Sequence, residues 1–220
     1  MSLSSQELME LRREYISEGI VVSKLNNCPY EQFEKWFSES LQQNVMEPNA
    51  MALSTADLEG NVKSRMVLLK QISKEKGFVF FSNYNSKKAQ QIENNNKVAL
   101  LFYWDMLKRQ IRISGEVQKL SEKESVDYFN SRPLASRVAS ILSKQSSLLK
   151  DKKSFQNEFD RRLEKAKSKK SLSVVKPEYW GGYAVKAVEI EFWQGREHRL
   201  HDRVVYHKKD HSWSKEMLYP

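Results

Sequence analysis

The sequence predicts an α+β protein with a largely antiparallel sheet or barrel. Two segments with helical periodicity come first, strand-like runs follow, and a helical, basic region precedes a last set of strands. This order lacks the regular strand–helix alternation of a parallel sheet. The 220 residues, of which 40% are hydrophobic and 11% aromatic, can bury a sizeable core.

Helical spacing is clearest near the N-terminus. The apolar positions of one helical face are Leu8, Leu11 and Tyr15, and those of the next are Tyr30, Phe33, Phe37 and Leu41. Proline is favoured in the first turn of a helix, so the second helix is expected to begin near Pro29.

Strand and turn signals then take over. Residues 51–55 and 64–72 flank a turn at Gly60 and Asn61, so we expect a hairpin, and Gly77 marks another turn before the apolar run 78–81. Residues 98–104 and 110–117 predict a further pair of strands.

Two short helices are expected among these strands. Ser86 is a suitable N-cap for a helix that ends near Asn94. Ser121 and Glu124 have the spacing of a capping box, which predicts a helix reaching about Phe129.

A basic helix and three strands complete the chain. Phe155, Phe159 and Leu163 recur every four residues within the lysine-rich region 144–170, which indicates an amphipathic helix with a charged outer face. The same charges could form a nucleic-acid surface, although acidic residues interrupt them. After Gly181 and Gly182 we expect strands at 183–193, 199–207 and 212–218.

Composition excludes several classes of protein. No apolar run approaches membrane-spanning length, and the polar start lacks the layout of a signal peptide, so the cytoplasm is the expected location. Cys28 is the single cysteine and there are only four histidines, which argues against a zinc site and excludes an intrachain disulfide. The seven glycines do not form a Walker or dinucleotide-binding motif.

Arg199, His201 and Arg203 alternate in the sequence behind Trp193. On a strand, residues two apart point the same way, so these three side chains would line one wall suited to an anionic or planar ligand. A solvated basic strand is the alternative, because alternating polar residues also mark the wet face of an antiparallel sheet.

Two other basic clusters could bind phosphate. Arg65 and Lys70 enclose an apolar strand, and Ser86, Lys87 and Lys88 stand at a helix start, where unpaired amides and the helix dipole favour anions. Basic residues beside a helix cap also occur on ordinary surfaces, so neither cluster is specific by itself.

Taken together, these segments resemble the pyridoxamine 5′-phosphate oxidase family. The motifs that carry the resemblance are residues 47–50, 64–70, 86–94, 128–133, 143–147, 180–182 and 191–203. It implies a single FMN-binding domain over residues 1–220, with a split β-barrel and flanking helices. It also implies a homodimer with two interfacial FMN sites, dimerisation and substrate strands over 174–220, and a mobile lid within 1–20.

The resemblance also implies roles for individual residues. The positions matching FMN contacts are Arg65, Met66, Val67, Leu68, Leu69, Lys70, Phe81, Ser82, Lys87, Lys88, Gln110, Gln145, Ser146, Trp193 and Arg203. The positions matching substrate contacts are Arg12, Tyr15, Lys70, Tyr128, Arg132, Ser136, Arg199 and His201, the last two also taken as catalytic. An ordinary amphipathic helix is the alternative to a lid at residues 12–15.

The implied reaction is oxidation of pyridoxamine or pyridoxine 5′-phosphate by O2 to pyridoxal 5′-phosphate, with release of hydrogen peroxide. Three positions depart from the family pattern: Lys87 replaces a frequent arginine, Phe81 a frequent tyrosine and Met217 an arginine. The alternatives are a flavin-binding split barrel of other specificity or without catalysis, and, more remotely, a nucleic-acid-binding module. No membrane partner is expected.

Overall fold

The computed structural model describes residues 5–11, 14–168, 174–210 and 212–220. The chain forms two compact units, which are described separately. The terminal unit comprises Met1–Pro48, Leu101–Ile113 and Val188–Pro220, and the central unit comprises Asn49–Leu100 and Ser114–Ala187.

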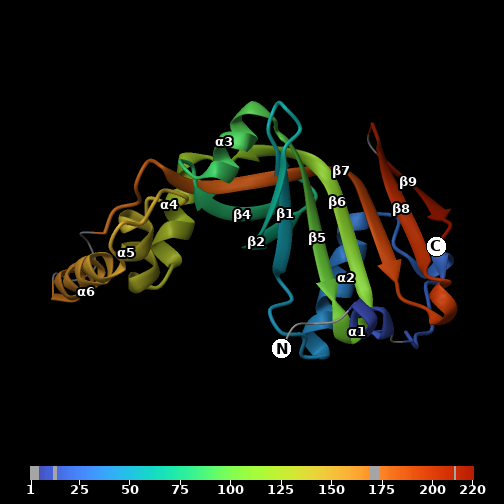
Figure 1. Cartoon of the computed structure of the whole chain (residues 1–220). Helices are drawn as coiled ribbons and strands as arrows, with labels where there is room; N and C mark the ends of the chain where they lie inside the picture. Colours follow the sequence, from blue (N-terminus) through green and yellow to red (C-terminus); the bar gives the residue numbers. More distant parts are fainter. Residues whose placement is uncertain (1–4, 12–13, 169–173, 211) are drawn as a thin grey trace. The chain divides into compact units, whose positions relative to one another are not determined.

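The described residues contain a nine-stranded sheet in the order β2-β1-β5-β6-β7-β4-β3, with β8 paired to β7 and β9 to β8 (Figure 1). The strands are β1 (Ala50–Ala56), β2 (Val62–Leu68), β3 (Gln71–Ser73), β4 (Gly77–Asn83), β5 (Lys97–Trp104), β6 (Arg109–Lys119), β7 (Trp180–Gln194), β8 (Asp202–Lys209) and β9 (Ser212–Leu218). The pairs β1–β2, β3–β4, β4–β7, β7–β8 and β8–β9 are antiparallel.

Helical elements precede and connect these strands. They are α1 (Ser5–Glu10), α2 (Pro29–Gln42), α3 (Lys87–Asn94), α4 (Glu122–Ser131), α5 (Leu134–Leu142) and α6 (Lys152–Ser168), with 3-10 turns at Val22–Lys24, Asp105–Leu107 and Glu197–Arg199. No helix of the described residues is long and apolar enough to cross a membrane.

The central unit confirms the predicted hairpin and both predicted helix caps. In the β1–β2 hairpin, Ala50 pairs with Leu68 and Ala56 with Val62. The Ser86 side chain accepts a hydrogen bond from the Ala89 amide at the start of α3. At the start of α4 both hydrogen bonds of the capping box between Ser121 and Glu124 are present.

Helices α4, α5 and α6 share an apolar cluster with the beginning of β7. Its buried members are Phe129, Val138, Ala166, Val174 and Trp180. The amphipathic α6 was expected, whereas α5 was not. Pro133 immediately precedes α5 and Arg132 follows α4, so the two helices meet at a two-residue junction.

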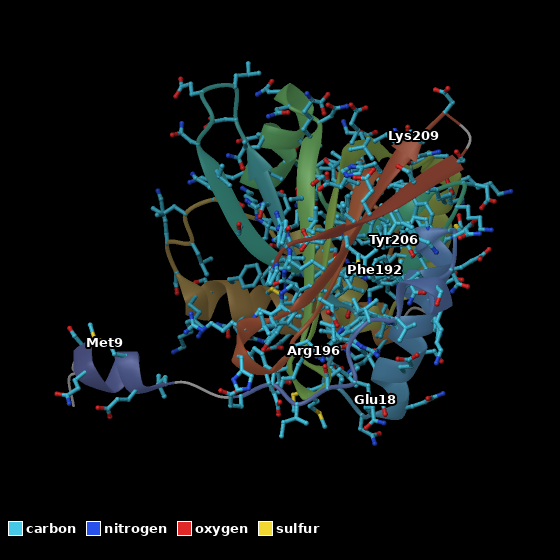
Figure 2. All side chains as sticks on the ribbon, turned by 90° about the vertical axis from the view of Figure 1, so that its right-hand side faces the viewer. Met9, Glu18, Phe192, Arg196, Tyr206 and Lys209 are labelled. Carbon is cyan, nitrogen blue, oxygen red and sulfur yellow. The ribbon has the colours of Figure 1, made fainter. Side chains whose placement is uncertain are left out.

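The terminal unit buries the first part of the predicted apolar face of α2, with Tyr30 and Phe33 buried and Phe37 half-buried, whereas Leu41 is 55% exposed. The Phe33 ring packs edge-on against Phe102, and the Trp36 ring packs edge-on against Phe192. Phe192 and Tyr206 lie on the neighbouring strands β7 and β8, with ring centroids 5.5 Å apart (Figure 2).

Several expected element boundaries were wrong. The strand expected over 64–72 is divided, because β2 ends at Leu68 and a separate strand β3 pairs with β4. The first helix ends at Glu10, so Tyr15 lies outside it. The strand expected over 199–207 begins only at Asp202, because His198 and Arg199 adopt the left-handed region with φ of 55° and 61°.

Gly181 and Gly182 do not precede the last strands but lie inside β7. A Cβ atom on Gly181 would lie 2.1 Å from the Tyr84 hydroxyl oxygen, and one on Gly182 would lie 2.8 Å from the Phe81 ring. The absence of a side chain therefore lets β7 pass close to β4, at the edge of the cavity described next.

Candidate cofactor and substrate site

A cavity of about 750 Å³ lies within the central unit. Its lining includes fourteen of the residues expected from the sequence, and they come from β2, β4, α3, α4, α5 and the loops between them: Arg65, Met66, Val67, Leu68, Lys70, Phe81, Ser82, Lys87, Lys88, Tyr128, Arg132, Ser136, Gln145 and Ser146. Leu69 is not among the lining residues, since its side chain is buried elsewhere and its amide donates to the Asn49 carbonyl oxygen.

The lining of the cavity is strongly basic. Its cationic side chains are Arg65, Lys70, Lys87, Lys88 and Arg132, and the lining described by the structure includes no aspartate or glutamate. Five cations without a carboxylate in one cavity attract anions and are well suited to phosphate groups.

Lys88 is the most deeply buried of these cations, with 9% of its surface exposed. Its amine donates to the hydroxyls of Ser82 and Ser86, both at 3.2 Å, and to the Gln145 side-chain oxygen at 2.9 Å. Burial, and secondly the charge of Arg65, lower the pKa of Lys88 to about 8. The amine is therefore held among neutral acceptors, and a bound anion would stabilise its charged form.

The loop at residues 143–147 closes over the start of α3. The Lys87 amide donates to the Ser146 hydroxyl at 3.3 Å, and Ser146 has a left-handed φ of 72°. Non-glycine residues in this sparsely populated region cluster at functional sites. Lys87 itself is exposed, with its side chain free to reach an anion at the helix N-terminus.

Arg65 projects from β2 and is anchored to β1. Its Nη1 atom donates to the Thr55 hydroxyl at 2.7 Å and to the Leu53 carbonyl oxygen at 3.1 Å. Burial lowers its pKa, and in the described part of the chain it has no carboxylate partner. The guanidinium therefore keeps its full charge for a ligand.

Arg132 occupies the junction between α4 and α5. Its guanidinium lies over the Trp180 indole at 4.7 Å from the ring centroid, and its Nη1 atom donates to the Ser140 hydroxyl at 2.7 Å. Burial lowers the pKa of Arg132. A cation–π contact and a hydrogen bond together fix its planar donor fork, which suits an anion such as phosphate.

Phe81 and Tyr128 form an aromatic pair beside Arg132. Their rings stack with centroids 3.8 Å apart, and the Phe81 ring also stacks on Trp180 at 5.4 Å. The phenylalanine at position 81 therefore makes a ring contact that does not depend on the hydroxyl of the family's usual tyrosine.

Five lining residues were missed by the sequence analysis as ligand contacts: Asn83, Ala139, Ser140, Ser143 and Trp180. Ser143 and Trp180 were noted only as parts of motifs. The serines could have been found once α5 was known, because Ser136, Ser140 and Ser143 follow helical spacing and face one side.

A second set of expected residues lies in the terminal unit. The rings of Trp193 and His201 have centroids 4.7 Å apart, and Tyr15 contacts both, at 6.0 Å and 5.8 Å. The segment that follows Tyr15 is held by two hydrogen bonds. The Ser17 hydroxyl donates to the Gly195 carbonyl oxygen, and the Ile20 amide donates to the Asp202 carboxylate. Glu18 and Arg196 lie at the same end of the unit (Figure 2).

The hydrogen bonding of His201 defines its tautomer. Its Nδ1 atom accepts the amide hydrogen of Arg196 at 3.0 Å, so in the neutral ring the proton is on Nε2. Burial, and next the charge of Arg199, lower the pKa of His201, while Asp202 opposes this shift. His201 is therefore arranged to donate a hydrogen bond from Nε2 at neutral pH.

Arg203 is the only member of the expected arginine–histidine wall that lies on a strand. Its Nε and Nη2 atoms donate to the two oxygens of buried Glu191, at 2.8 Å and 3.1 Å, and this pairing raises the pKa of Arg203. Arg112 adds a third bond to Glu191 at 3.2 Å. Arg203 is thus held in a fixed orientation by Glu191, a carboxylate that it shares with Arg112.

The remaining expected residues are dispersed. Arg199 is exposed in its left-handed turn rather than on a strand face shared with Arg203, and Gln110 is half-buried on β6. Arg12 lies outside the described residues. The described residues hold no group of three or more His, Cys, Asp or Glu side chains placed to bind a metal.

Two family models together match residues 37–220 of the chain. Residues 37–179 match the model for pyridoxamine 5′-phosphate oxidase, and residues 180–220 match the model for the pyridoxine 5′-phosphate oxidase C-terminal dimerisation region.

Similar proteins of known sequence or structure agree. A pyridoxine/pyridoxamine 5′-phosphate oxidase of Vesicomyosocius okutanii is 45% identical over 97% of this chain and 99% of the relative, and one of Crocosphaera subtropica is 44% identical over 97% and 100%. The crystal structure of PhzG from Burkholderia lata 383, in complex with tetrahydrophenazine-1-carboxylic acid, has a TM-score of 0.85 at 25% identity, covering 92% of this chain and 98% of that one. An FMN-binding protein of Nostoc punctiforme related to pyridoxamine 5′-phosphate oxidase has a TM-score of 0.69 at 15% identity and supports the fold alone.

These matches confirm the expected class of fold, an α+β split barrel with flanking helices. On its sequence, its fold and the phosphate-suited cavity of its central unit, the chain belongs to the pyridoxine/pyridoxamine 5′-phosphate oxidase family.

Proposed function

We propose that this protein uses FMN and O2 to oxidise pyridoxamine or pyridoxine 5′-phosphate at C4′, yielding pyridoxal 5′-phosphate and hydrogen peroxide, with ammonia also released from the amine. The observation that carries the proposal is the cavity of the central unit, whose described lining has five cations and no carboxylate. FMN and substrate each bring a phosphate, and two dianions in one cavity require many cationic and hydroxyl donors.

The residues of the cavity fit FMN. Its volume of about 750 Å³ lies within the roughly 300–1,000 Å³ typical of cofactor sites. Lys88, Arg65 and Lys87, with the amides at the start of α3 and the Ser146 hydroxyl, would hold the FMN phosphate. When bound, FMN supplies the two-electron chemistry that no side chain offers.

The substrate phosphate is assigned to the other cations of the cavity. Arg132, held by Trp180 and Ser140, would form charge-assisted bonds to it, together with Lys70, Tyr128 and Ser136. This anchor would orient the substrate ring, which is the positioning that speeds a reaction between bound groups.

In the terminal unit, Arg199 and His201 are assigned to the substrate ring. His201 would donate from Nε2 to an acceptor at the ring edge, because its Nδ1 atom is already occupied by the Arg196 amide. Trp193, Arg203 and Gln110 are assigned to FMN, and Arg12 and Tyr15 to a lid over the substrate. These assignments rest on the match of positions to the family motifs.

The protein is further proposed to act as a cytoplasmic homodimer and as a single domain. The match of residues 180–220 to a dimerisation region supports the dimer, in which the strands of 174–220 would take part.

Two measurements test the proposed function. The purified protein should be yellow and release FMN rather than FAD on denaturation, as chromatography of the pigment would show. It should produce peroxide with pyridoxine 5′-phosphate, and pyridoxine should be a far poorer substrate, because each lost charge-assisted bond costs roughly 1.5–3 kcal/mol.

A colourless protein that fails to take up FMN would refute the proposal. A yellow protein without peroxide formation would favour a flavin-binding protein of other function, and equal efficiency with both substrates would show that the phosphate residues are misassigned.

A further inference from the structure

A buried chain of hydrogen bonds connects Arg65 to helix α3. It runs from the Arg65 guanidinium through the Thr55 hydroxyl and the Gln91 side chain to the backbone of Asn61. We propose that Thr55 and Gln91 are positioning residues, which hold Arg65 and α3 together as one receptor for the FMN phosphate. This inference rests on the proposed function, which assigns Arg65, Lys87 and Lys88 to that phosphate.

The geometry fixes the direction of every bond in this relay. The Thr55 oxygen accepts from Arg65 Nη1 at 2.7 Å, so its hydroxyl hydrogen is donated to Gln91 Oε1, at 2.6 Å. The Gln91 amide nitrogen then donates to the Asn61 carbonyl oxygen at 3.2 Å. Only 1% of Thr55 and 8% of Gln91 is exposed, so water offers little replacement if a member is removed.

The relay joins three elements, the two strands of the hairpin and a helix that comes later in the sequence. Thr55 is on β1, Arg65 is on β2 and Gln91 is on α3, which packs against β1 (Figure 1). On a helix, residues three and four apart share a face, so Gln91 lies one turn after Lys88 and Lys87. The bond between Thr55 and Gln91 therefore sets the spacing between the arginine of the hairpin and the lysines of the helix.

The neutrality of the relay matters for anion binding. Arg65 and Lys88 are close enough for the charge of Arg65 to lower the pKa of Lys88. Carboxylates at 55 or 91 would relieve this repulsion, but they would also cancel the positive charge that a phosphate needs. A hydroxyl and an amide instead orient the guanidinium and leave its charge intact.

Binding of two flavins distinguishes a positioning role of Thr55 and Gln91 from a role in fold stability alone. Loss of a buried hydrogen bond lowers fold stability in either case. A relay that positions Arg65 for a phosphate should in addition weaken FMN binding while leaving riboflavin binding unchanged, since riboflavin has the same ring system and no phosphate.

The test compares dissociation constants of FMN and riboflavin for the full chain freed of flavin, measured by fluorescence quenching at fixed salt. Thr55→Val keeps the shape of the side chain and removes the hydroxyl. We expect its FMN affinity to fall about tenfold and its riboflavin affinity by less than about twofold. Thr55→Ser, which restores the hydroxyl, should recover most of the loss, and Gln91→Met should reproduce the effect of Thr55→Val from the helix side.

The chain offers a matched control. Ser54 and Ser64 are cross-strand partners next to Thr55 in the same hairpin, and their hydroxyl oxygens are 2.8 Å apart at the surface. The double variant Ser54→Ala, Ser64→Ala removes one hydroxyl pair from β1 and β2 without touching the relay. Its ratio of FMN to riboflavin affinity should equal that of the wild type.

The outcomes separate the inference from the proposed function. If Arg65→Ala leaves the FMN-to-riboflavin affinity ratio unchanged, the assignment of Arg65 to the phosphate fails. If Arg65→Ala lowers the ratio but Thr55→Val and Gln91→Met do not, or if these two weaken both ligands equally, the relay inference alone is overturned.

Discussion

The pKa of Lys88, lowered to about 8, predicts that the affinity of the protein for FMN depends on pH. The FMN phosphate is a dianion above its second pKa of about 6, so the bound state favours the charged amine. We expect FMN affinity to fall as the pH rises from 7 to 9.5, because the flavin-free protein loses this charge near pH 8. Fluorescence titration at several pH values measures the effect.

Two controls accompany this titration. Riboflavin affinity should not follow the same curve, and Lys88→Arg, whose charge persists, should flatten it. The stability of the flavin-free fold should change with pH in the opposite direction to the FMN affinity. Lys88 contributes to this stability above its unfolded pKa of about 10.4, and the contribution is lost as the pH falls through about 8. A pH-independent FMN affinity would contradict the role of Lys88.

Arg199 and His201 give a second prediction. Arg199→Ala and His201→Ala should each lower kcat/KM by about tenfold or more while FMN stays bound. Arg203→Ala should mainly lower the affinity for FMN. The measurement is steady-state kinetics beside FMN titration. If these residues formed only a solvated basic surface, each substitution would change stability by at most ~0.5 kcal/mol and leave the kinetics unaltered.

The protonation of His201 adds a pH signature. The pKa of His201 is lowered from 6.5, so the ring is neutral at pH 7. The neutral ring contributes to the stability of the fold above pH 6.5, and this contribution is lost as the pH falls through the lowered pKa. Protonation also breaks the bond from the Arg196 amide to Nδ1. The wild type should therefore lose activity on the acid side of 6.5, and His201→Ala should lack that decline.

Among the elements, those with local signals were predictable. Helix α3 follows from the Ser86 cap, α4 from its capping box, and the β1–β2 hairpin from its turn. The alternation of polar residues wrongly predicted a strand at Arg199 and His201. Such a pattern does not show that the backbone of His198 and Arg199 adopts the left-handed region. The Thr55–Gln91 bond could not be foreseen either, since its partners are 36 positions apart and both residue types are usually exposed.

The junction of α4 and α5 was missed as an element but supplies much of the candidate phosphate site. Trp180, from β7, supports Arg132 there. Trp180→Leu should raise KM for pyridoxine 5′-phosphate about tenfold, since a desolvated cation–π contact contributes roughly 1–2 kcal/mol. Trp180→Phe, which keeps an aromatic face, should lose less. The KM for pyridoxine, which has no phosphate, is the control for a general disturbance of the site. An equal rise in KM for both substrates would contradict a role of Trp180 at the phosphate.

For the whole molecule, the prediction concerns assembly. If FMN sites lie at a homodimer interface, dilution to monomer should release flavin, because assembly and cofactor binding are linked by mass action. Sedimentation velocity with absorbance detection of the flavin measures both together. A monomer that retains full FMN occupancy would contradict the inferred architecture. The single-domain organisation stays a prediction, which cooperative unfolding of the holoprotein would support.

The basic cavity, whose described lining holds no carboxylate, also links the abundance of the folded protein to the supply of FMN. Repulsion among the cations of the cavity destabilises the folded protein without an anion, so binding of FMN should stabilise the fold. A ligand at 100 times its Kd adds about 2.7 kcal/mol to the folded state, a large share of the stability of an ordinary domain. Cells short of riboflavin should therefore hold less folded enzyme as well as less active enzyme, and the supply of one vitamin would limit the making of another.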